Sequence, residues 1–322
     1  MSYEPPFERN NVIDSLCMEI AELVGMISPD AEFASNPVLH RKLRIKTIHS
    51  SLLIEGNGLD ETSVTAILDG KRVLGNAHDI QEVENAKRAY DLLPKFDPYS
   101  IQDLLDAHRI MMDGLVAEAG RFRTGNVGVF DGDSLIHAGT PATYVPEVIA
   151  NLFDWIERTT LHPLPASCVF HYEFEFAHPF ADGNGRTGRL WHTLLLSHWR
   201  PILAWLPVES TIRQRQSGYY EAFAKSEAKG SCEFFVEFML RAIRDSMIPF
   251  AKPESHHEEN LSSALSFFEQ NPRGTIADLA RLLGCSKRTA ERIVAELKST
   301  GKLTREGATR AGTWHVEGHS EA

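Results

Sequence analysis

Twelve residues in the middle of the chain, 178–189 (His-Pro-Phe-Ala-Asp-Gly-Asn-Gly-Arg-Thr-Gly-Arg), constrain the fold more than any other stretch. Apolar residues with helical spacing precede and follow them, at 166–177 and 186–199, so the stretch is predicted to be a turn between two helices. Residues 183–185 (Gly-Asn-Gly) would then lie at a helix N-terminus, where free backbone N–H groups and the helix dipole favour an anion. The sequence therefore predicts a mainly helical protein that binds an anion at this turn.

Four side chains around the turn suit a nucleotide. Asp182 supplies a hard oxygen ligand for Mg²⁺, which proteins hold with one or two carboxylates plus substrate phosphates. Arg186 and Arg189, three residues apart on one helix face, can neutralise terminal phosphates, and His178 can act as a general base on a hydroxyl. Each has a simpler alternative, because His178 can be a capping or core histidine and Arg186 can pair with Asp182. Their combination favours a nucleotide site.

Composition places the chain among ordinary folded proteins. Its 322 residues are 43% hydrophobic and 24% charged, which predicts one large and one small domain. The formal net charge of −11 argues against indiscriminate nucleic-acid binding. The sequence has four separated cysteines, no signal-peptide pattern and no apolar run long enough to span a membrane. We therefore expect a cytoplasmic protein with reduced thiols.

Periodic apolar residues predict further helices on both sides of the turn. Besides the two helices above, these helices are expected at residues 11–27, 37–56, 60–68, 79–93, 100–115, 146–158, 219–226 and 232–247. Two short strands, 126–130 and 134–138, are predicted around a turn at 131–133 that is rich in Asp and Gly. Because an isolated hairpin is not stable alone, it must lie on the helical body, with one edge free to pair.

Glu55 stands at the C-terminal end of the predicted helix 37–56, where Gly56-Asn57-Gly58 is typical of a helix end. A carboxylate at this position opposes the helix dipole, whose C-terminal end is already negative. Either the side chain is solvated, or it has a cationic partner elsewhere in the fold. Ser51 lies four residues earlier, on the same face of the last turn.

The polar, proline-containing residues 249–258 are predicted to link a domain at 1–248 to a small domain at 259–322. Helices at 261–270, 275–283 and 286–299, followed by strands at 302–304 and 313–316, are expected there, and the region resembles a winged helix-turn-helix over about residues 259–318. Its basic residues are candidates for contact with DNA phosphates, but glutamates dilute them, so protein docking or dimerisation is favoured. The basic residues are Lys287, Arg288, Arg292, Lys302, Arg305 and Arg310, and the glutamates are Glu291, Glu296 and Glu306.

Residues 178–189 match, position by position, the signature His-x-Phe-x-(Asp/Glu)-Gly-Asn-Gly-Arg-x-x-Arg of the Fic family, and the chain resembles this family over about residues 35–245. Residues 120–129 and 143–146 resemble the family's flap and the helix after it. Glu82 and Asn85 resemble its upstream helix, and Tyr219 and Tyr220 resemble the segment that closes the adenine pocket. The resemblance implies a mainly α fold, with a helical Fic-type core and a β-hairpin flap. An Asn that some relatives carry after the paired tyrosines is replaced near Glu227, which leaves the base specificity open.

The resemblance implies transfer of AMP from Mg-ATP to a Ser, Thr or Tyr hydroxyl of a target protein, which can be the protein itself. His178 would deprotonate the hydroxyl, Asp182 would hold Mg²⁺ and Phe180 would anchor the loop. The hairpin would clamp a target segment by strand addition, through Val129 and Ile136, unless it merely packs on the body. The phosphates would be bound by Gly183, Asn184, Gly185, Arg186, Thr187, Gly188 and Arg189, with the two arginines on the β- and γ-phosphates.

Residues 51–56 match the inhibitory pattern of the family, (Ser/Thr)-x-x-x-Glu-(Gly/Asn), which would make residues 37–56 an N-terminal inhibitory helix that includes Ser51. On this interpretation Glu55 pairs with Arg189 and takes the space of the γ-phosphate, so that ATP binds with its α-phosphate misaligned for attack. Two questions stay open at this point: whether Glu55 also supports removal of AMP, and whether the chain forms a homodimer.

Three other functions remain alternatives. A metallohydrolase would use His171, Glu175 and His178, spaced i, i+4 and i+7, but this leaves the Gly-Asn-Gly turn and both arginines unexplained. A nucleotide-sensing transcriptional regulator would bind DNA through the C-terminal domain. A Fic-type transferase with another donor, or one that transfers phosphate or phosphocholine, would keep the fold; the complete motif favours AMP.

Overall fold

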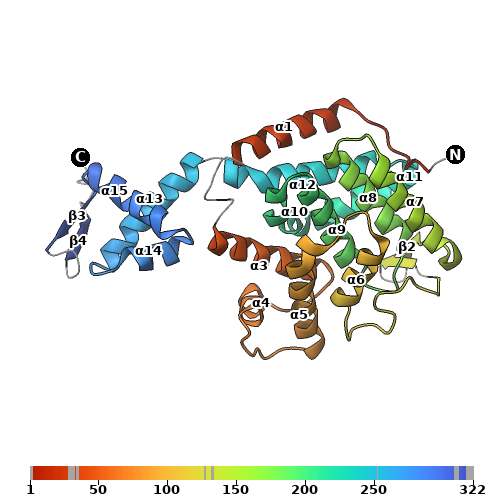
Figure 1. The fold of residues 1–322 in the computed structure, drawn as a ribbon, viewed down its shortest axis with the longest axis horizontal. Helices are drawn as coiled ribbons and strands as arrows, with labels where there is room; N and C mark the ends of the chain where they lie inside the picture. The colour runs from red at the N-terminus through yellow and green to blue at the C-terminus, as the bar shows by residue number, and fades with distance from the viewer. Residues whose placement is uncertain are drawn as a thin grey trace. The chain divides into compact units, whose positions relative to one another are not determined.

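Helices make up most of the chain, as the apolar periodicity predicts (Figure 1). The structure is a computed structural model that describes residues 3–27, 33, 36–126, 128–131, 134–251, 253–307 and 312–316, without the side chains of 128–138 and 253–259. Its helices are α1 (Asn11–Ile27), α3 (Pro37–Ile54), α4 (Glu61–Leu68), α5 (Ala77–Leu92), α6 (Ile101–Met111), α7 (Val145–Arg158), α8 (Pro163–Ala177), α9 (Asn184–Trp199), α10 (Val208–Gln214), α11 (Gln216–Lys229), α12 (Glu233–Ala251), α13 (Pro253–Gln270), α14 (Ile276–Leu283) and α15 (Lys287–Ser299). Short 3-10 turns are η1 (Leu93–Lys95), η2 (Ala142–Tyr144) and η3 (Pro201–Trp205).

The strands form two separate antiparallel hairpins. In the first, β1 (Gly128–Asp131) pairs with β2 (Ser134–Ala138), and the register shifts between Val129 and Phe130. In the second, β3 (Leu303–Glu306) pairs with β4 (Thr313–Val316). The sequence placed the start of the first hairpin two residues too early, at residue 126.

The ends of α3 follow from local hydrogen bonding. At its start, the side chain of Asn36 accepts the backbone N–H groups of Val38 and Leu39. At its end, Gly56 has a left-handed backbone with a φ of 89°, its N–H donates to Leu53, and the next N–H, of Asn57, donates to Leu52. This is a Schellman ending, which glycine favours because it lacks a Cβ. It fixes the direction in which residues 55 and 57 leave the helix.

The chain divides into two units, one of residues Met1–Glu22 and Leu43–Ser246, the other of Leu23–Lys42 and Met247–Ala322. In the first unit α8 packs between α7 and α9 (Figure 1). Aromatic rings fill the space around these helices: Phe153 contacts Phe170 and Trp191, and Phe174 contacts Phe180. This buried core holds the two helices that flank residues 178–183 in fixed positions.

The second unit has its own apolar core, around Phe268, Leu279, Ile293 and Trp314. Residues 23–42 were predicted to belong with the first domain, but they are part of this unit, and the amide of Asn36 donates to the backbone oxygen of Gly284. Residues 249–258 also differ from the expected irregular linker. Helix α12 extends to Ala251 with Pro249 inside it, and α13 begins at Pro253, where proline is tolerated in a first helical turn.

Two further differences concern the large unit. Helix α9 begins at Asn184, two residues before the predicted start, because Gly183 takes the N-cap position. Residues 201–214 form η3 and α10, for which the sequence analysis predicted no element.

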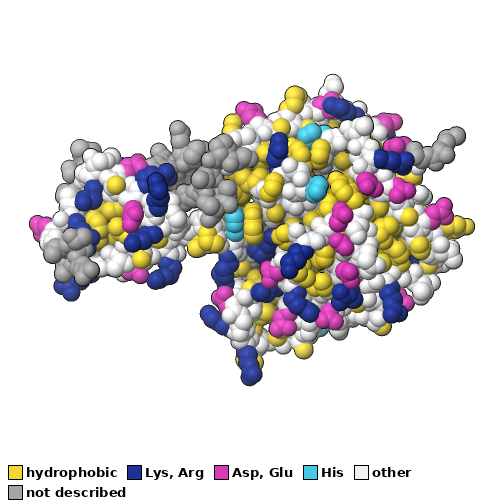
Figure 2. Space-filling view, in the orientation of Figure 1, with side chains coloured by type: hydrophobic (Ala, Val, Ile, Leu, Met, Phe, Trp, Pro, Cys, Tyr) yellow, Lys and Arg dark blue, Asp and Glu magenta, His cyan; other side chains and the backbone are white. Residues whose placement is uncertain are grey.

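Within the described residues no helix is long and apolar enough to cross a membrane. In the face drawn in Figure 2, basic and acidic side chains are interspersed over the large unit.

Candidate active site

The turn between α8 and α9 is held by its own side chains. Phe180 is fully buried, and both its N–H and its oxygen bond the amide of Asn184, at 2.8 and 2.9 Å. His178 caps the end of α8 with a left-handed backbone, φ 47°, which among the described residues other than glycine occurs only there. Because this conformation is unfavourable for a residue with a Cβ, the surrounding contacts must maintain it.

His108 of α6 supports the same turn, and sequence reasoning missed it. Its ring stacks on Phe180 with centroids 3.6 Å apart. One ring nitrogen accepts the N–H of Gly120 at 2.9 Å, and the other bonds the backbone oxygen of Asp182 at 3.0 Å. Burial lowers the pKa of His108 to about 4, so the ring is neutral and can accept one bond while donating the other.

The N-terminus of α9 has the features of an anion site. Gly183 has a φ of 81° and no side-chain cap, so the first N–H groups of the helix keep no partner from a capping side chain. A Cβ on Gly185 would collide with the carboxylate of Glu55, and a Cβ on Gly183 would collide with Met112. The glycines therefore let a carboxylate oxygen approach the helix end closely. In this structure that oxygen belongs to Glu55.

Arg189 is almost fully buried, with 3% of its surface exposed, and binds two residues of α3 and its end. It donates to the hydroxyl and the backbone oxygen of Ser51, at 3.0 Å each, and to the carboxylate of Glu55 at 2.8 Å. Burial opposes the charge of Arg189, but the neighbouring carboxylate of Glu55 outweighs it and raises the arginine pKa. The pair that the sequence predicted is thus in direct contact.

Arg186 has different partners. Its guanidinium bonds the carboxylate of Glu82 on α5 and, at 3.0 Å, that of Asp182. The other oxygen of Glu82 accepts the amide of Asn57 at 2.8 Å. The end of α3 therefore contacts both arginines, one through Glu55 and the other through Asn57 and Glu82. The local alternative from sequence, an Arg186–Asp182 pair, is also present.

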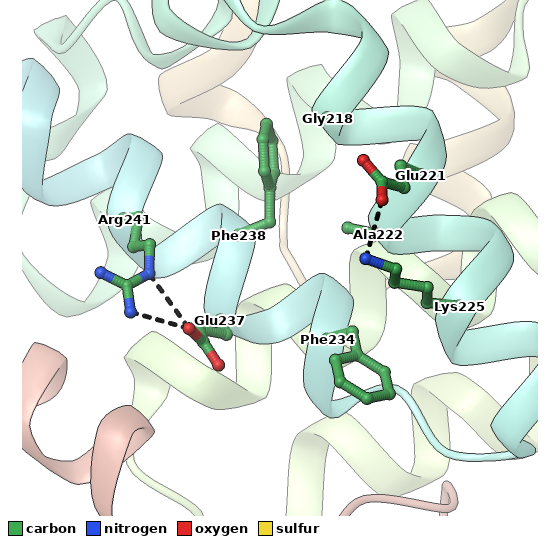
Figure 3. Close-up of a pocket in the computed structure, with 8 residues that line it drawn as sticks. All are labelled: Gly218, Glu221, Ala222, Lys225, Phe234, Glu237, Phe238 and Arg241. Carbon is green, nitrogen blue, oxygen red and sulfur yellow. Dashed lines mark hydrogen bonds and ion pairs between the residues drawn. The ribbon is translucent and has the colours of Figure 1, made fainter.

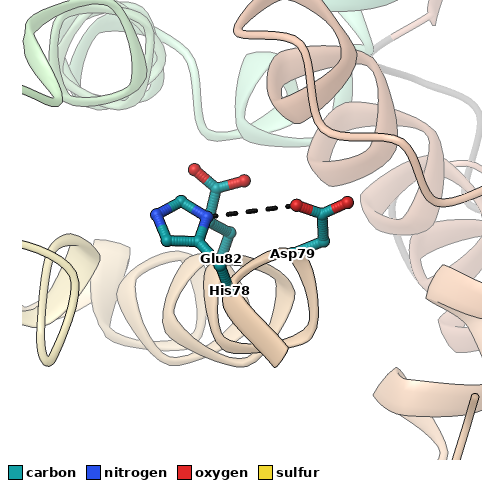
Figure 4. A group of neighbouring side chains, drawn as sticks. All are labelled: His78, Asp79 and Glu82. Carbon is teal, nitrogen blue, oxygen red and sulfur yellow. Dashed lines mark ion pairs between the residues drawn. The ribbon is translucent and has the colours of Figure 1, made fainter. Parts of the chain in front are cut away.

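His78, Asp79 and Glu82 form a group at the start of α5 whose ligand atoms lie within 4.8 Å of one another (Figure 4). Its members already have protein partners. Glu82 binds Arg186 and Asn57, and Asp79 accepts the N–H of Gly58 at 3.1 Å. We therefore interpret the group as an anchor for the residues after α3, and we assign no metal to it.

Asp182 fits the role of a magnesium ligand. Its side chain is 54% exposed, and its described bonds, from Gly183 and from Arg186, both go to Oδ1. The second oxygen can therefore face a hydrated cation beside the helix N-terminus. A single carboxylate combined with substrate phosphates is the donor set that Mg²⁺ prefers.

The metallohydrolase alternative does not match the geometry. His178 lies beyond the end of α8, so it does not continue the face of His171 and Glu175. Within the part of the chain that the structure describes, these three residues form no group with metal-ligand spacing. Instead, the ring of His171 lies 3.5 Å from the carboxylate of Glu175 and 3.4 Å from the hydroxyl of Tyr219.

Glu175 is a largely buried carboxyl group beside the phosphate turn, with 13% of its side chain exposed, and a Cβ on Gly188 would collide with it. Burial raises its pKa from 4.5 to about 7, with the nearby His178 and the charge of Arg189 opposing the rise and Glu55 adding to it. A raised pKa means that the folded protein binds this proton more tightly than the unfolded chain. The proton therefore stabilises the fold at low pH, and this stabilisation is lost as the pH rises from 4.5 through 7.

We expect Glu175→Gln to remove that loss, because the amide stays neutral at every pH. Relative to the original protein, the variant should gain up to about 3 kcal/mol between pH 5 and pH 8, since one pKa unit is about 1.4 kcal/mol. Thermal melts at both pH values measure the difference. Glu84→Gln, an exposed glutamate on α5, is the control and should show no such gain. An equal effect of both substitutions at both pH values would contradict the buried, proton-binding state of Glu175.

The two predicted adenine-pocket residues have different environments. Tyr219 is buried, whereas Tyr220 is 51% exposed and its hydroxyl lies 3.2 Å from the amide of Gln216. Gln216 also donates to the backbone oxygen of Ile54 at 3.2 Å. Gln216 thus connects Tyr220 to the end of α3. No sequence pattern had indicated a role for Gln216.

The flap is described by its backbone. The pairing of β1 with β2 is present, but the side chains of Val129 and Ile136 lie outside the described residues.

A separate groove of about 240 Å³ lies between α11 and α12 (Figure 3). It is lined by Gly218, Glu221, Ala222, Lys225, Phe234, Glu237, Phe238 and Arg241, and includes none of the predicted site residues. Its charges pair with one another, Lys225 with Glu221 and Arg241 with Glu237.

Known proteins resemble this chain in sequence. A model of the Fic/DOC family matches residues 98–196, which include the whole phosphate turn. The chain is 32% identical over 179 residues to the protein adenylyltransferase fic-1 of Caenorhabditis elegans, and 30% identical over 207 residues to the protein adenylyltransferase Fic of Nematostella vectensis. These matches cover 51% and 60% of this chain but 34% and 45% of the relatives, so the chain spans less than half the length of either.

A solved structure matches over the full length. The crystal structure of a Fic family protein from Desulfovibrio desulfuricans G20 has a TM-score of 0.78 and 41% sequence identity, and the match covers 99% of this chain and 100% of that one. Identity at this level over whole chains is evidence of common descent as well as of common fold. The chain belongs to the Fic family.

Proposed function

We propose that this protein is a protein adenylyltransferase, which transfers AMP from Mg-ATP to a hydroxyl side chain of a target protein. The observation that carries the proposal is the N-terminus of α9, where two buried arginines and a left-handed His178 surround a turn of glycines. Positioning and charge neutralisation, which phosphoryl-type transfer requires, are what such a site provides. Relatives named protein adenylyltransferases, at about 30% identity, support the same reaction.

In the proposed mechanism His178 takes the proton of the target hydroxyl, and that oxygen attacks the α-phosphorus. The new oxygen–phosphorus bond forms as the bond from the α-phosphorus to the bridging oxygen breaks, and pyrophosphate leaves. The N–H groups at residues 183–185 orient the phosphates, with Thr187 and Gly188 in the first turn of α9. Arg186 and Arg189 neutralise the negative charge of the β- and γ-phosphates. Mg²⁺, held by Asp182, would neutralise phosphate charge.

We further propose that Glu55 restrains this reaction. Its carboxylate binds Arg189 and lies over Gly185, where a γ-phosphate would need to be. Ser51 holds the same guanidinium through its hydroxyl and backbone oxygen, so the arginine is fully engaged by α3 and its end. ATP would then bind with its γ-phosphate displaced and its α-phosphate away from the line of attack. Residues 37–56 would be the inhibitory helix.

Position-specific labelling of ATP tests the reaction itself. The Glu55→Gly protein is incubated with a cell lysate and ATP that carries label on either the α- or the γ-phosphate. AMP transfer leaves the α-label on protein and releases the γ-label as pyrophosphate. Retention of more γ-label than in the same lysate without this protein would show phosphate transfer instead and would contradict the proposal.

For the second unit we propose a winged helix-turn-helix module with a docking role, made of α13, α14, α15 and the β3–β4 hairpin. Of the basic residues on α15, Lys287 lies 3.8 Å from Glu291. Arg305 of the hairpin lies over the ring of Trp314 at 4.6 Å. Arg310 falls outside the described residues.

DNA binding by this module is not favoured, because Glu291, Glu296 and Glu306 dilute the positive charge that would neutralise DNA phosphates. We expect genomic DNA fragments to migrate unchanged in a gel-shift assay with the full chain at moderate salt. A salt-sensitive shift that disappears in an Arg288→Ala, Arg292→Ala double variant would overturn this expectation and favour the nucleotide-sensing regulator.

A further inference from the structure

Arg123 lies at the base of the flap and contacts both of its ends. One guanidinium nitrogen donates to the backbone oxygen of Gly125 at 2.8 Å, on the side that leads into β1. Another donates to the backbone oxygen of Thr140, on the side that leaves β2. Arg123 is 3% exposed, whereas Gly125 is exposed and Thr140 partly exposed, so the guanidinium reaches from the interior to the base of the flap. The two ends of the flap are thereby joined by one guanidinium.

The same guanidinium also bonds the turn that carries the proposed base. Its Nε donates to the backbone oxygen of His178 at 2.7 Å, and a terminal nitrogen lies 3.4 Å from the oxygen of Ala177. The backbone N–H of Arg123 donates to Pro179 at 3.0 Å. Three consecutive peptide groups around the left-handed His178 are therefore held by one residue.

The chemistry of these bonds requires arginine. Among the described residues no carboxylate pairs with Arg123, and its acceptors are all backbone oxygens. Burial lowers the pKa of Arg123, so the carbonyl dipoles must compensate for its desolvated charge. Only the planar guanidinium fork, with donors in several fixed directions, can reach four oxygens from three chain segments at once, whereas a lysine ammonium is a single point.

We infer that Arg123 is a positioning residue that couples the flap to His178. A target strand that pairs with the flap is then placed at a fixed distance from the base, because flap and base share one buried anchor. The inference rests on the proposed transfer reaction for its purpose, but the mechanical coupling can be measured without any reaction. Arg123 would align the target hydroxyl with the base, and it would have no part in binding ATP.

Asn126 provides a matched control. Its side chain accepts the N–H of Ala142 at 2.9 Å, so it also joins the two ends of the flap, but it makes no described contact with the turn at 178–183. It is exposed, so its replacement leaves the interior unchanged. Asn126→Ala should loosen the flap alone, and Arg123→Lys should loosen the flap and the turn together.

The test is amide hydrogen exchange of the full chain, without nucleotide. In Arg123→Lys we expect exchange to become about tenfold faster both in peptides spanning 124–142, which include the two ends of the flap, and in those spanning 174–183, because each segment loses hydrogen bonds to the guanidinium. In Asn126→Ala only the peptides spanning 124–142 should change. Unchanged exchange at 174–183 in Arg123→Lys would overturn the coupling. If Arg123→Lys does not fold, Arg123→Gln is measured in its place, and unchanged exchange at 174–183 in that variant would overturn the coupling.

An activity measurement separates this inference from the proposed function. In a Glu55→Gly background, Arg123→Lys should lower kcat/KM for the protein target by about tenfold while the Kd for ATP stays within about twofold. An equal loss of ATP affinity would contradict a role confined to the target. If the Glu55→Gly parent transfers no AMP, the proposed function fails, and the exchange experiment still decides whether Arg123 couples flap and turn.

Discussion

Replacement of Glu55 by glycine is expected to raise the rate of AMP transfer on the order of a hundredfold. The substitution removes the carboxylate that binds Arg189 and covers Gly185, so the arginine and the helix N-terminus become available to the γ-phosphate. The α-phosphate can then align with the attacking oxygen. Initial rates of label incorporation from α-labelled ATP, at saturating nucleotide, measure the change.

Two further variants separate charge from space at this position. Glu55→Gln keeps the volume of the side chain but removes its charge, and should activate less than Glu55→Gly. Ser51→Ala removes one hydroxyl from Arg189 and leaves the carboxylate in place, so a small activation is expected. Equal rates for the original protein and for Glu55→Gly would contradict the inhibitory role of α3.

The activating substitution should also cost stability. Arg189 is buried, and without Glu55 it keeps only its bonds to Ser51, so we expect the unfolding free energy to fall by about 2 kcal/mol. ATP supplies a new anion to the same guanidinium. It should therefore raise the Tm of Glu55→Gly more than that of the original protein.

Replacement of His178 by alanine in the Glu55→Gly background should lower AMP transfer by about a thousandfold, because the target hydroxyl loses its base. The affinity for ATP should stay within about twofold, since the phosphates are assigned to the turn and to the two arginines. Calorimetric titration with ATP and rate measurements on the same preparations test both parts. The control is His198→Ala, an exposed histidine at the end of α9, which should leave the rate unchanged. Retained transfer in His178→Ala would assign the base to another group.

The local parts of this account could be predicted from the sequence. Apolar periodicity identified the helices around the turn, and the glycines of 56–58 and 183–185 identified two helix ends, because these signals depend on neighbours in the chain. The pairing of Glu55 with Arg189 spans 134 positions and was reached only through the family pattern. No local pattern carries that information.

The supporting contacts could not be predicted for the same reason. Glu82, Asn57, His108 and Arg123 act across long sequence separations, and each looks like an ordinary polar residue on a helix or loop. Glu175 shows that spacing by itself can mislead. Its spacing from His171 suits a metal ligand, an alternative that the sequence analysis did not favour, and its burial makes it a carboxyl group with a raised pKa. Burial and long-range partners decide the role of a titratable residue, and spacing alone does not.

The most direct test of the central claim is intact and peptide mass spectrometry of the protein after incubation with Mg-ATP and a cell lysate. Three forms are compared: the original chain, Glu55→Gly, and Glu55→Gly combined with His178→Ala. The account predicts an added AMP mass on a Ser, Thr or Tyr, of the protein itself or of a lysate protein, that is abundant with Glu55→Gly, scarce with the original chain and absent with the double variant. An AMP adduct that is equally abundant with all three forms, or absent with Glu55→Gly, would contradict it.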